Sequence, residues 1–287
     1  MPAIFFALIS YFFWGTGVFA EAIVARRLNS YSLVFWSACF SVILGIVFVP
    51  FQIQNLKAYT TPLLLFNIAL GLIALLSGTL VYFEALKRGN RALVGTIASS
   101  FPFVTVLASF LFLGERVSLA QFGAIFVIFT GLVLSVVSLK SINKKLVINS
   151  GIILAVVTMV SWGLYFAFLK IIIAKVGWFW PNYIAFALFP IVLLLMKVKG
   201  IKLERLTKNN VIFLIIFSTV LVRLAEFSYS LGISKGLVAI VAPIAGANPT
   251  LFVILAFFIF KDPITRQQIA GIITTLIGIV LLSVFSV

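Results

Sequence analysis

The chain has 287 residues, of which 63% are hydrophobic and 9% are charged. Soluble domains carry about 25% charged residues, so the composition excludes a soluble globular protein and a large extramembrane active site. The net charge of +15 would indicate a nucleic-acid partner in a soluble protein. Here we expect no nucleic acid, because basic residues of membrane proteins gather in loops that fix orientation and meet lipid phosphates.

Long apolar runs follow one another along the chain, and none alternates apolar with polar residues as a membrane barrel strand does. A run of about 18 or more such residues is long enough to cross the hydrocarbon core as a helix. The first run lacks a basic leader and a small-residue cleavage site, so we expect it to remain as a span. The runs without any charged residue are Ala92–Gly114, Val117–Leu139, Leu146–Leu169, Val176–Met196 and Gly236–Phe260.

We therefore predict an all-α integral membrane protein with ten transmembrane helices and short loops. Cys39 is the only cysteine, so the chain holds no internal disulfide. The predicted spans cover residues 3–24, 31–51, 61–85, 91–113, 118–139, 147–174, 178–196, 210–233, 236–260 and 265–285.

Basic residues are distributed unevenly over the predicted loops. Loops after odd-numbered spans hold fifteen of them and loops after even-numbered spans hold five. The positive-inside bias then places the odd-numbered loops in the cytoplasm and both termini outside the inner (cell) membrane. The larger group is Arg26, Arg27, Lys87, Arg88, Arg91, Lys140, Lys144, Lys145, Lys197, Lys199, Lys202, Arg205, Lys208, Lys261 and Arg266; the smaller is Lys57, Arg116, Lys170, Lys175 and Lys235.

The chain contains an internal repeat. Residues Tyr82–Gly89 align with Tyr229–Gly236 at an offset of 147, and the repeat predicts two domains, 1–140 and 147–287. Other pairs at offsets of 147 or 148 are Ala92 with Ala239, Pro102 with Pro249, Glu115 with Asp262, Gln121 with Gln268, Gly131 with Gly278, and Trp14-Gly15 with Trp162-Gly163.

The two predicted copies have opposite orientations in the membrane. Each copy holds an odd number of spans, so the second copy enters from the opposite face. The loop charges agree: the loops after the first and third helices of the first copy hold five basic residues against two, and the equivalent loops of the second copy hold three against seven. Inverted repeats are typical of secondary transporters, because two similar halves give two near-equivalent conformations, each open to one side.

The repeated residues resemble the EamA domain, in both copies and over essentially the whole chain. The resemblance implies a transporter of the drug/metabolite transporter superfamily, with a ten-helix 5+5 inverted repeat around a central cavity. Members export or import amino acids, other metabolites, sugars or nucleotide derivatives. The first copy carries Ala85–Gly89, Ala92, Pro102, Gly114–Arg116, Gln121 and Gly131, and the second carries Gly236, Ala239, Pro249, Asp262, Gln268, Gly271 and Gly278.

The resemblance implies that spans 1 and 6, 3 and 8, and 4 and 9 line the cavity. In span 1, Glu21 follows Trp14 by two helical turns and is a candidate proton carrier, since burial favours the protonated carboxyl. The alternative, which the position near the helix end favours, is an interfacial glutamate close to Arg26 and Arg27.

Five aromatic residues on these spans are candidates for a substrate-binding cavity wall. Aromatic rings bind apolar groups and, through their faces, cations. The alternative is packing or a membrane-interface belt. The five are Trp14, Tyr82, Trp162, Tyr165 and Tyr229.

Pro102 and Pro249 lie inside predicted spans, where proline removes a backbone hydrogen bond and kinks the helix. Ser99, Ser100 and Asn248 lie beside these kinks and are candidate donors to substrate. Alternatively, each kink serves only helix packing.

Arg223 and Glu226 are three residues apart in span 8 and share a helix face. An isolated charge at that depth costs about 2.5–3.5 kcal/mol on insertion scales, which favours a functional interpretation. Arg223 would bind a substrate carboxylate or phosphate, and Glu226 would bind an amine or carry a proton. The alternatives are a self-neutralising pair that packs the bundle, or an arginine that snorkels to an interface.

Glu115 and Asp262 stand at the starts of the helices that follow the kinked spans. Asp262-Pro263 has the pattern of an N-cap followed by proline at the first helical position. Capping explains both acids, and we expect a structural role for them.

The leading hypothesis is a secondary active transporter, exporter or uptake carrier, for small polar or amphipathic metabolites such as amino acids. The chain has no Walker sequence, so we expect protons or the substrate gradient, and not ATP hydrolysis by the chain itself, to drive alternating access. We also expect a monomer without metal or cofactor. A lipid-modifying membrane enzyme is an alternative, but the chain has no His and only six acids. A channel is another, although no ring of charges is evident.

Overall fold

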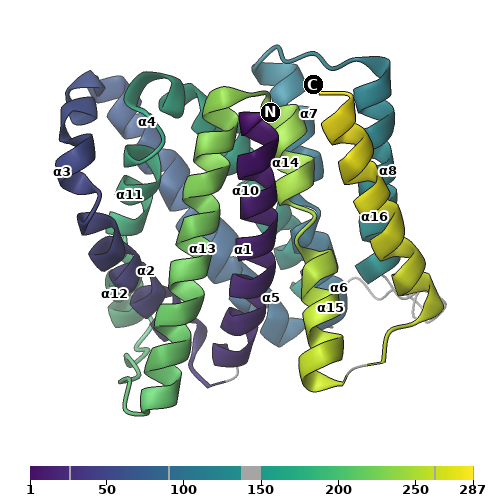
Figure 1. Ribbon diagram of the computed structural model, residues 1–287. Coiled ribbons are helices and arrows are strands. Elements are labelled where there is room, and N and C mark those ends of the chain that lie inside the picture. The colour runs from purple at the N-terminus through teal and green to yellow at the C-terminus, as the bar shows by residue number, and fades with distance from the viewer. Residues whose placement is uncertain (26, 90, 137–149, 262, 287) are drawn as a thin grey trace.

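A computed structural model describes residues 1–25, 27–89, 91–136, 150–261 and 263–286. The predicted roles of Arg26, Asp262 and the Lys140–Lys145 connection lie outside these residues. Every regular element in the described part is helical (Figure 1): α1 (Pro2–Val24), α2 (Ser30–Ile46), α3 (Val49–Gln52), the 3₁₀ helix η1 (Ile53–Ala58), α4 (Thr61–Leu72), the π-helix η2 (Ile73–Leu80), α5 (Val81–Arg88), α6 (Arg91–Ser99), α7 (Phe101–Phe112), α8 (Leu119–Val136), α10 (Ser150–Val176), α11 (Trp180–Ala187), α12 (Pro190–Val198), α13 (Asn209–Lys235), α14 (Val238–Ala245), α15 (Pro249–Phe260) and α16 (Arg266–Val284).

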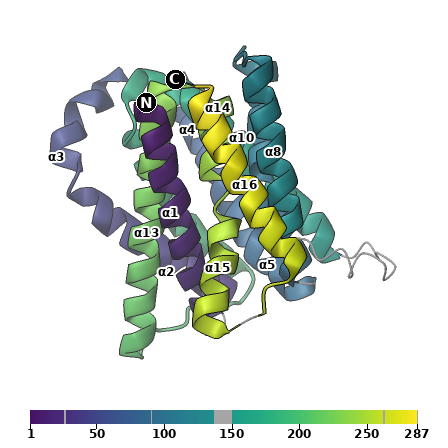
Figure 2. The same ribbon diagram turned by 45° about the vertical axis from the view of Figure 1, so that its right-hand side comes forward.

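The described helices form nine segments that are long and apolar enough to cross a membrane, and ten if the bent pair Ser30–Ile46 and Val49–Ala58 is one span. That pair bends by 67°, and α3 lies at the edge of the bundle (Figure 2), where the Gln52 carbonyl accepts a hydrogen bond from the Trp180 side chain at 2.6 Å. The all-α membrane fold is therefore confirmed. The bend explains why the apolar run 31–51 is not one straight helix.

Proline interrupts several predicted spans. Pro102 and Pro249 each stand in the first turn of a helix that follows a break, α7 after α6 and α15 after α14. Pro50 and Pro190 stand in the same position at the starts of α3 and α12, and the sequence analysis did not treat them as breaks. Proline fits the first turn because its missing N–H would be unpaired there in any case.

Hydrogen bonds between the two halves recur at the repeat offset. The Ser10 hydroxyl on α1 donates to the Ala225 carbonyl on α13 at 2.7 Å. The Thr158 hydroxyl on α10 donates to the Gly78 carbonyl on η2 at 3.3 Å. The donors Ser10 and Thr158 are 148 positions apart, and the acceptors Gly78 and Ala225 are 147 positions apart, so this one contact recurs at the offset found in the sequence.

Helices α8 and α16 pack at very short range through glycines that obey the same offset. A Cβ placed on Gly131 would clash with the Thr275 amide nitrogen, and one placed on Gly278 would lie 2.7 Å from the Ile128 side chain. Small residues at such crossings let helix backbones approach closely, as membrane helix pairs do.

Both termini lie at the same end of the bundle (Figure 1). We call this the terminal end and the other the far end. Large apolar side chains cover the outside of the bundle, as a surface in contact with acyl chains requires. Exposed examples are Phe5, Phe12, Leu111, Phe126, Phe213, Phe258, Ile273 and Val280.

Candidate functional site

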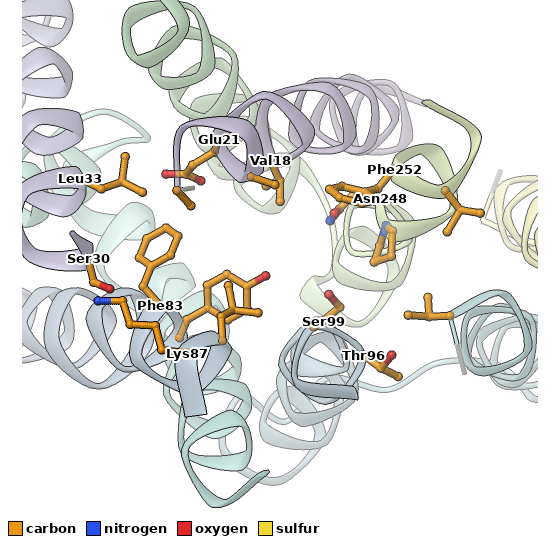
Figure 3. Close-up of a pocket in the computed structure, with 18 of the residues that line it drawn as sticks. Val18, Glu21, Ser30, Leu33, Phe83, Lys87, Thr96, Ser99, Asn248 and Phe252 are labelled. Atoms are coloured by element: carbon orange, nitrogen blue, oxygen red, sulfur yellow. The ribbon is translucent and has the colours of Figure 1, made fainter. Parts of the chain in front are cut away.

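A cavity of about 470 Å³ opens between the two halves, and we call it the central cavity. Its walls come from the last turns of α1, the start of α2, helices α5 and α6, the α14–α15 junction and the start of α16, which lie toward the far end (Figures 1 and 3). Its polar lining consists of Glu21, Ser30, Tyr82, Lys87, Thr96, Ser99, Asn248 and Gln268.

A smaller pocket of about 90 Å³, the inner pocket, holds the buried charges. Arg223 and Glu226 from α13 line it together with Glu21 from α1. Glu21 also lines the central cavity (Figure 3). The two spaces therefore meet at this carboxylate, which stands between the large polar chamber and the ion pair.

Arg223 and Glu226 form an ion pair with 2.6 Å between the arginine Nη1 and the glutamate Oε2. Their side chains are only 17% and 13% exposed. The guanidinium lies 4.4 Å from the ring centre of Phe186, but its buried Nε has no hydrogen-bond partner among the described residues. An unpaired buried donor costs about 1–3 kcal/mol, and because this Nε is closed to solvent, a partner could reach it only after the side chains around it move.

The Glu21 carboxylate makes no hydrogen bond or ion pair that joins it to another described side chain, although the Arg223 charge attracts it. With all three groups ionised, one guanidinium faces two carboxylates. The site then carries a net negative charge and attracts a cationic group. A proton on either carboxylate would neutralise the three groups together.

The five aromatic candidates separate into two groups. Trp162 and Tyr165 line the inner pocket, and Tyr82 lines the central cavity with its ring centre 5.2 Å from that of Trp162. Tyr165 also belongs to the buried core, as do Trp14 and Tyr229, whose ring centres are 5.6 Å apart. These last two line neither the central cavity nor the inner pocket.

The residues beside the helix breaks face the central cavity. Ser99 at the end of α6 and Asn248 before α15 both line it (Figure 3). The Asn248 side-chain amide donates to the Ala245 carbonyl at 3.2 Å. Ser100 instead donates its hydroxyl to the Thr96 carbonyl at 2.9 Å, within the same stretch of chain.

The two breaks differ in how tightly they pack. A Cβ on Gly246 would clash with the Pro102 side chain, so the end of α14 is in direct contact with α7. At the positions 147 residues away, Ser99 and Pro249 line the central cavity. The contact between Gly246 and Pro102 is therefore closed, whereas Ser99 and Pro249, at the matching positions, border an open space.

Glu115 caps a helix, but not the one that the sequence analysis expected. Its two carboxylate oxygens accept hydrogen bonds from the Val238 and Ala239 amides, both at 2.8 Å, at the start of α14. The prediction that Glu115 caps the following helix is wrong, because Ser118 and Gln121 exchange capping bonds before α8. A carboxylate at the start of α14 satisfies free N–H groups and complements the helix dipole.

Lys170 is a structural residue within α10, although the sequence analysis counted it among the loop residues. Its ammonium group on α10 donates to the Gly236 carbonyl at 2.9 Å and to the Ile233 carbonyl. It thus binds the end of α13 next to the Glu115 cap, and both contacts lie toward the terminal end (Figure 1). Its signal in the sequence is a lysine that interrupts the apolar residues 150–176 six positions before their end.

The sequence profile of the EamA-like transporter family matches residues 1–137 and 149–284. A curated protein of Methanocaldococcus jannaschii, described as "Uncharacterized protein MJ1333.1", is 31% identical over 128 residues, which are 44% of this chain and 90% of that protein. A solved structure described as "Crystal structure of protein" superposes with a TM-score of 0.79 at 17% identity, over 98% of this chain and 96% of that chain. At that identity the likeness concerns the fold alone.

Proposed function

Since the chain belongs to the EamA-like transporter family, we propose that it is a secondary active transporter of small polar or amphipathic metabolites such as amino acids. The observation that carries this proposal is the meeting of the central cavity and the inner pocket at Glu21. A polar cavity on the far-end side that adjoins a buried charge cluster is what a carrier needs to bind a polar solute at mid-depth.

The proposal includes a 5+5 inverted repeat of domains 1–140 and 147–287. Three observations support it: two separate family matches, the recurrence of the Ser10 and Thr158 hydrogen bonds at one offset, and a relative of which 90% aligns with 44% of this chain. In this arrangement a pseudo-twofold axis in the membrane plane relates the two halves, so exchanging their conformations converts a packing open to one side into a packing open to the other, which is alternating access.

The direction of opening follows from the unequal breaks. We infer that the tight Gly246–Pro102 contact closes the path to the terminal end, and that the cavity lined by Ser99 and Pro249 opens toward the far end. Transport would bring Ser99 and Pro249 into contact and separate Gly246 from Pro102. With both termini outside, as the loop charges predict, this conformation faces the cytoplasm.

Substrate recognition would use the three buried charges. Arg223, which lines the inner pocket, would bind a carboxylate or phosphate, while Glu21 and Glu226 would receive an amine or a proton. Trp162, Tyr165 and Tyr82 form the aromatic wall, and Asn248 and Ser99 line the approach. We assign Trp14 and Tyr229 to packing, and Pro102 and Pro249 to the helix breaks.

The test is solute flux into liposomes that contain the purified protein, with candidates chosen from metabolite pools by thermal shift. Saturable flux that is stimulated by substrate on the opposite side identifies a carrier, whereas linear flux without such stimulation identifies a channel and refutes the proposal. Glu21→Gln should abolish accumulation driven by a proton gradient. Glu84→Gln, which changes a carboxylate that lines neither space, is the matched control.

A further inference from the structure

A third cavity of about 220 Å³ lies beside the central cavity, and we call it the lateral groove. Helices α6, α7, α8 and α15 form its walls. Most of its lining is apolar, with three hydroxyl residues on one side. The lining residues are Thr96, Ser99, Ser100, Phe103, Phe129, Leu132, Val133, Val136 and Pro249.

The inner end of the lateral groove joins the central cavity. Thr96, Ser99, Val136 and Pro249 line both spaces. In Figure 3, Thr96 and Ser99 project from the same helix at the edge of the central cavity, with Asn248 across from Ser99. The lateral groove and the central cavity therefore share a wall, whose hydroxyl residues Thr96 and Ser99 belong to both linings.

The outer end of the groove faces the bilayer. Phe103 is 56% exposed and Val133 is 48% exposed, and both lie within segments long and apolar enough to span a membrane. Apolar side chains exposed on such segments contact acyl chains. The Phe103 and Phe129 rings meet edge to face with centres 5.9 Å apart, which gives the groove a smooth apolar wall.

We propose that the lateral groove binds the alkyl chain of an amphipathic substrate that enters the central cavity from the bilayer, while its polar head lies at Ser99 and Asn248. An apolar path alone would suit a hydrocarbon, and the polar cavity alone would suit a hydrophilic solute. A site in which the apolar groove adjoins the polar cavity favours a molecule that has both an alkyl chain and a polar head. This inference rests on the proposed function and narrows its substrate class.

The test uses a cysteine at the junction, Ser99→Cys, in a Cys39→Ser background that removes the only native thiol. The thiol reacts with alkyl methanethiosulfonates to form a mixed disulfide and release methanesulfinate. Octyl methanethiosulfonate partitions into the bilayer, whereas trimethylammonium-ethyl methanethiosulfonate reaches the thiol only through water. The reaction rate of each reagent is measured with the protein in liposomes.

Adding Val133→Trp should fill the groove and lower the octyl rate by about tenfold, while the ammonium rate stays unchanged and thereby shows that the protein is folded. Phe103→Ala should widen the groove and raise the octyl rate. Val280→Trp is the matched control, since Val280 is the counterpart of Val133 at the offset of 147, is 61% exposed and lines none of the three cavities. Equal effects of Val133→Trp on both reagents, or no effect on either, would overturn the proposal.

A second arm separates a substrate chain from the acyl chain of a resident lipid. If a lipid occupies the groove, stripping lipid from the detergent-purified protein will accelerate the octyl reaction, and the assignment to substrate is then wrong. An unchanged octyl reaction rate supports the assignment of the groove to the substrate chain. Because labelling measures access and not flux, failure here would leave the proposed transport function standing.

Discussion

At the scale of single residues, the ion pair between Arg223 and Glu226 decides between packing and binding. Two buried charges that only neutralise each other contribute little net stability, because desolvation offsets their attraction. Both side chains line the inner pocket, which shares Glu21 with the lining of the central cavity. These features favour a role in binding.

Exchanging the two charges tests that role. The double variant Arg223→Glu with Glu226→Arg keeps an ion pair but moves the guanidinium to another position. The exchanged pair should lose one charge-assisted contact to substrate, which is worth about 1.5–3 kcal/mol. We therefore expect flux in liposomes to fall by about tenfold or more. The thermal transition of the purified protein should change little, because an ion pair is kept. Normal flux in the exchanged variant would show that the pair only packs the bundle.

At the scale of elements, helix α14 is held at its start by a residue from the other half. The Glu115 cap should be worth about 1–2 kcal/mol, as a lost N-cap is. Glu115→Ala is therefore expected to lower the thermal transition of the purified protein, whereas Glu84→Ala removes only surface ion pairs and should lower it less. Equal shifts in the two variants would refute the capping role.

The contact between Gly246 and Pro102 gives a second prediction at this scale. A side chain at 246 cannot fit the closed contact, so Gly246→Val should disfavour the described conformation and slow exchange. Gly123→Val is the control, since a Cβ there meets no atom within 4 Å. Flux into liposomes is measured for both variants. Equal flux of the Gly246→Val and Gly123→Val proteins would mean that this contact does not open and close.

At the scale of the whole molecule, the long uncharged runs predicted most of the helical fold that the described residues show, whereas the orientation inferred from loop charge stays a prediction. The helical fold and most span boundaries agree within a few residues, because long uncharged runs have no alternative to helices in a bilayer. The sequence analysis did not predict the bend after Ile46, because the apolar run continues through Pro50 without any loss of apolar character.

The candidate site was less accessible to sequence reasoning. Charges such as Glu21 and Arg223 stand out in apolar spans, so their candidacy could be inferred from one sequence. That Trp14 packs in the core while Trp162 lines a pocket depends on helix rotation, which the matching Trp-Gly pairs do not reveal. Likewise, Glu115 caps a helix more than 100 residues away, a contact that local capping patterns cannot anticipate.

The central claim is that two equivalent contacts open in turn. Its most direct test is the reactivity of two single-cysteine variants, Ser99→Cys and Ala247→Cys, each in the Cys39→Ser background, toward a membrane-impermeant thiol reagent added to one side of sealed vesicles. We predict that the Ser99→Cys protein reacts only from the far end and the Ala247→Cys protein, whose substituted position is buried, only from the terminal end. Any substrate or condition that raises one rate should lower the other. Reaction of both variants from the same side, or rates that rise together, would contradict the account.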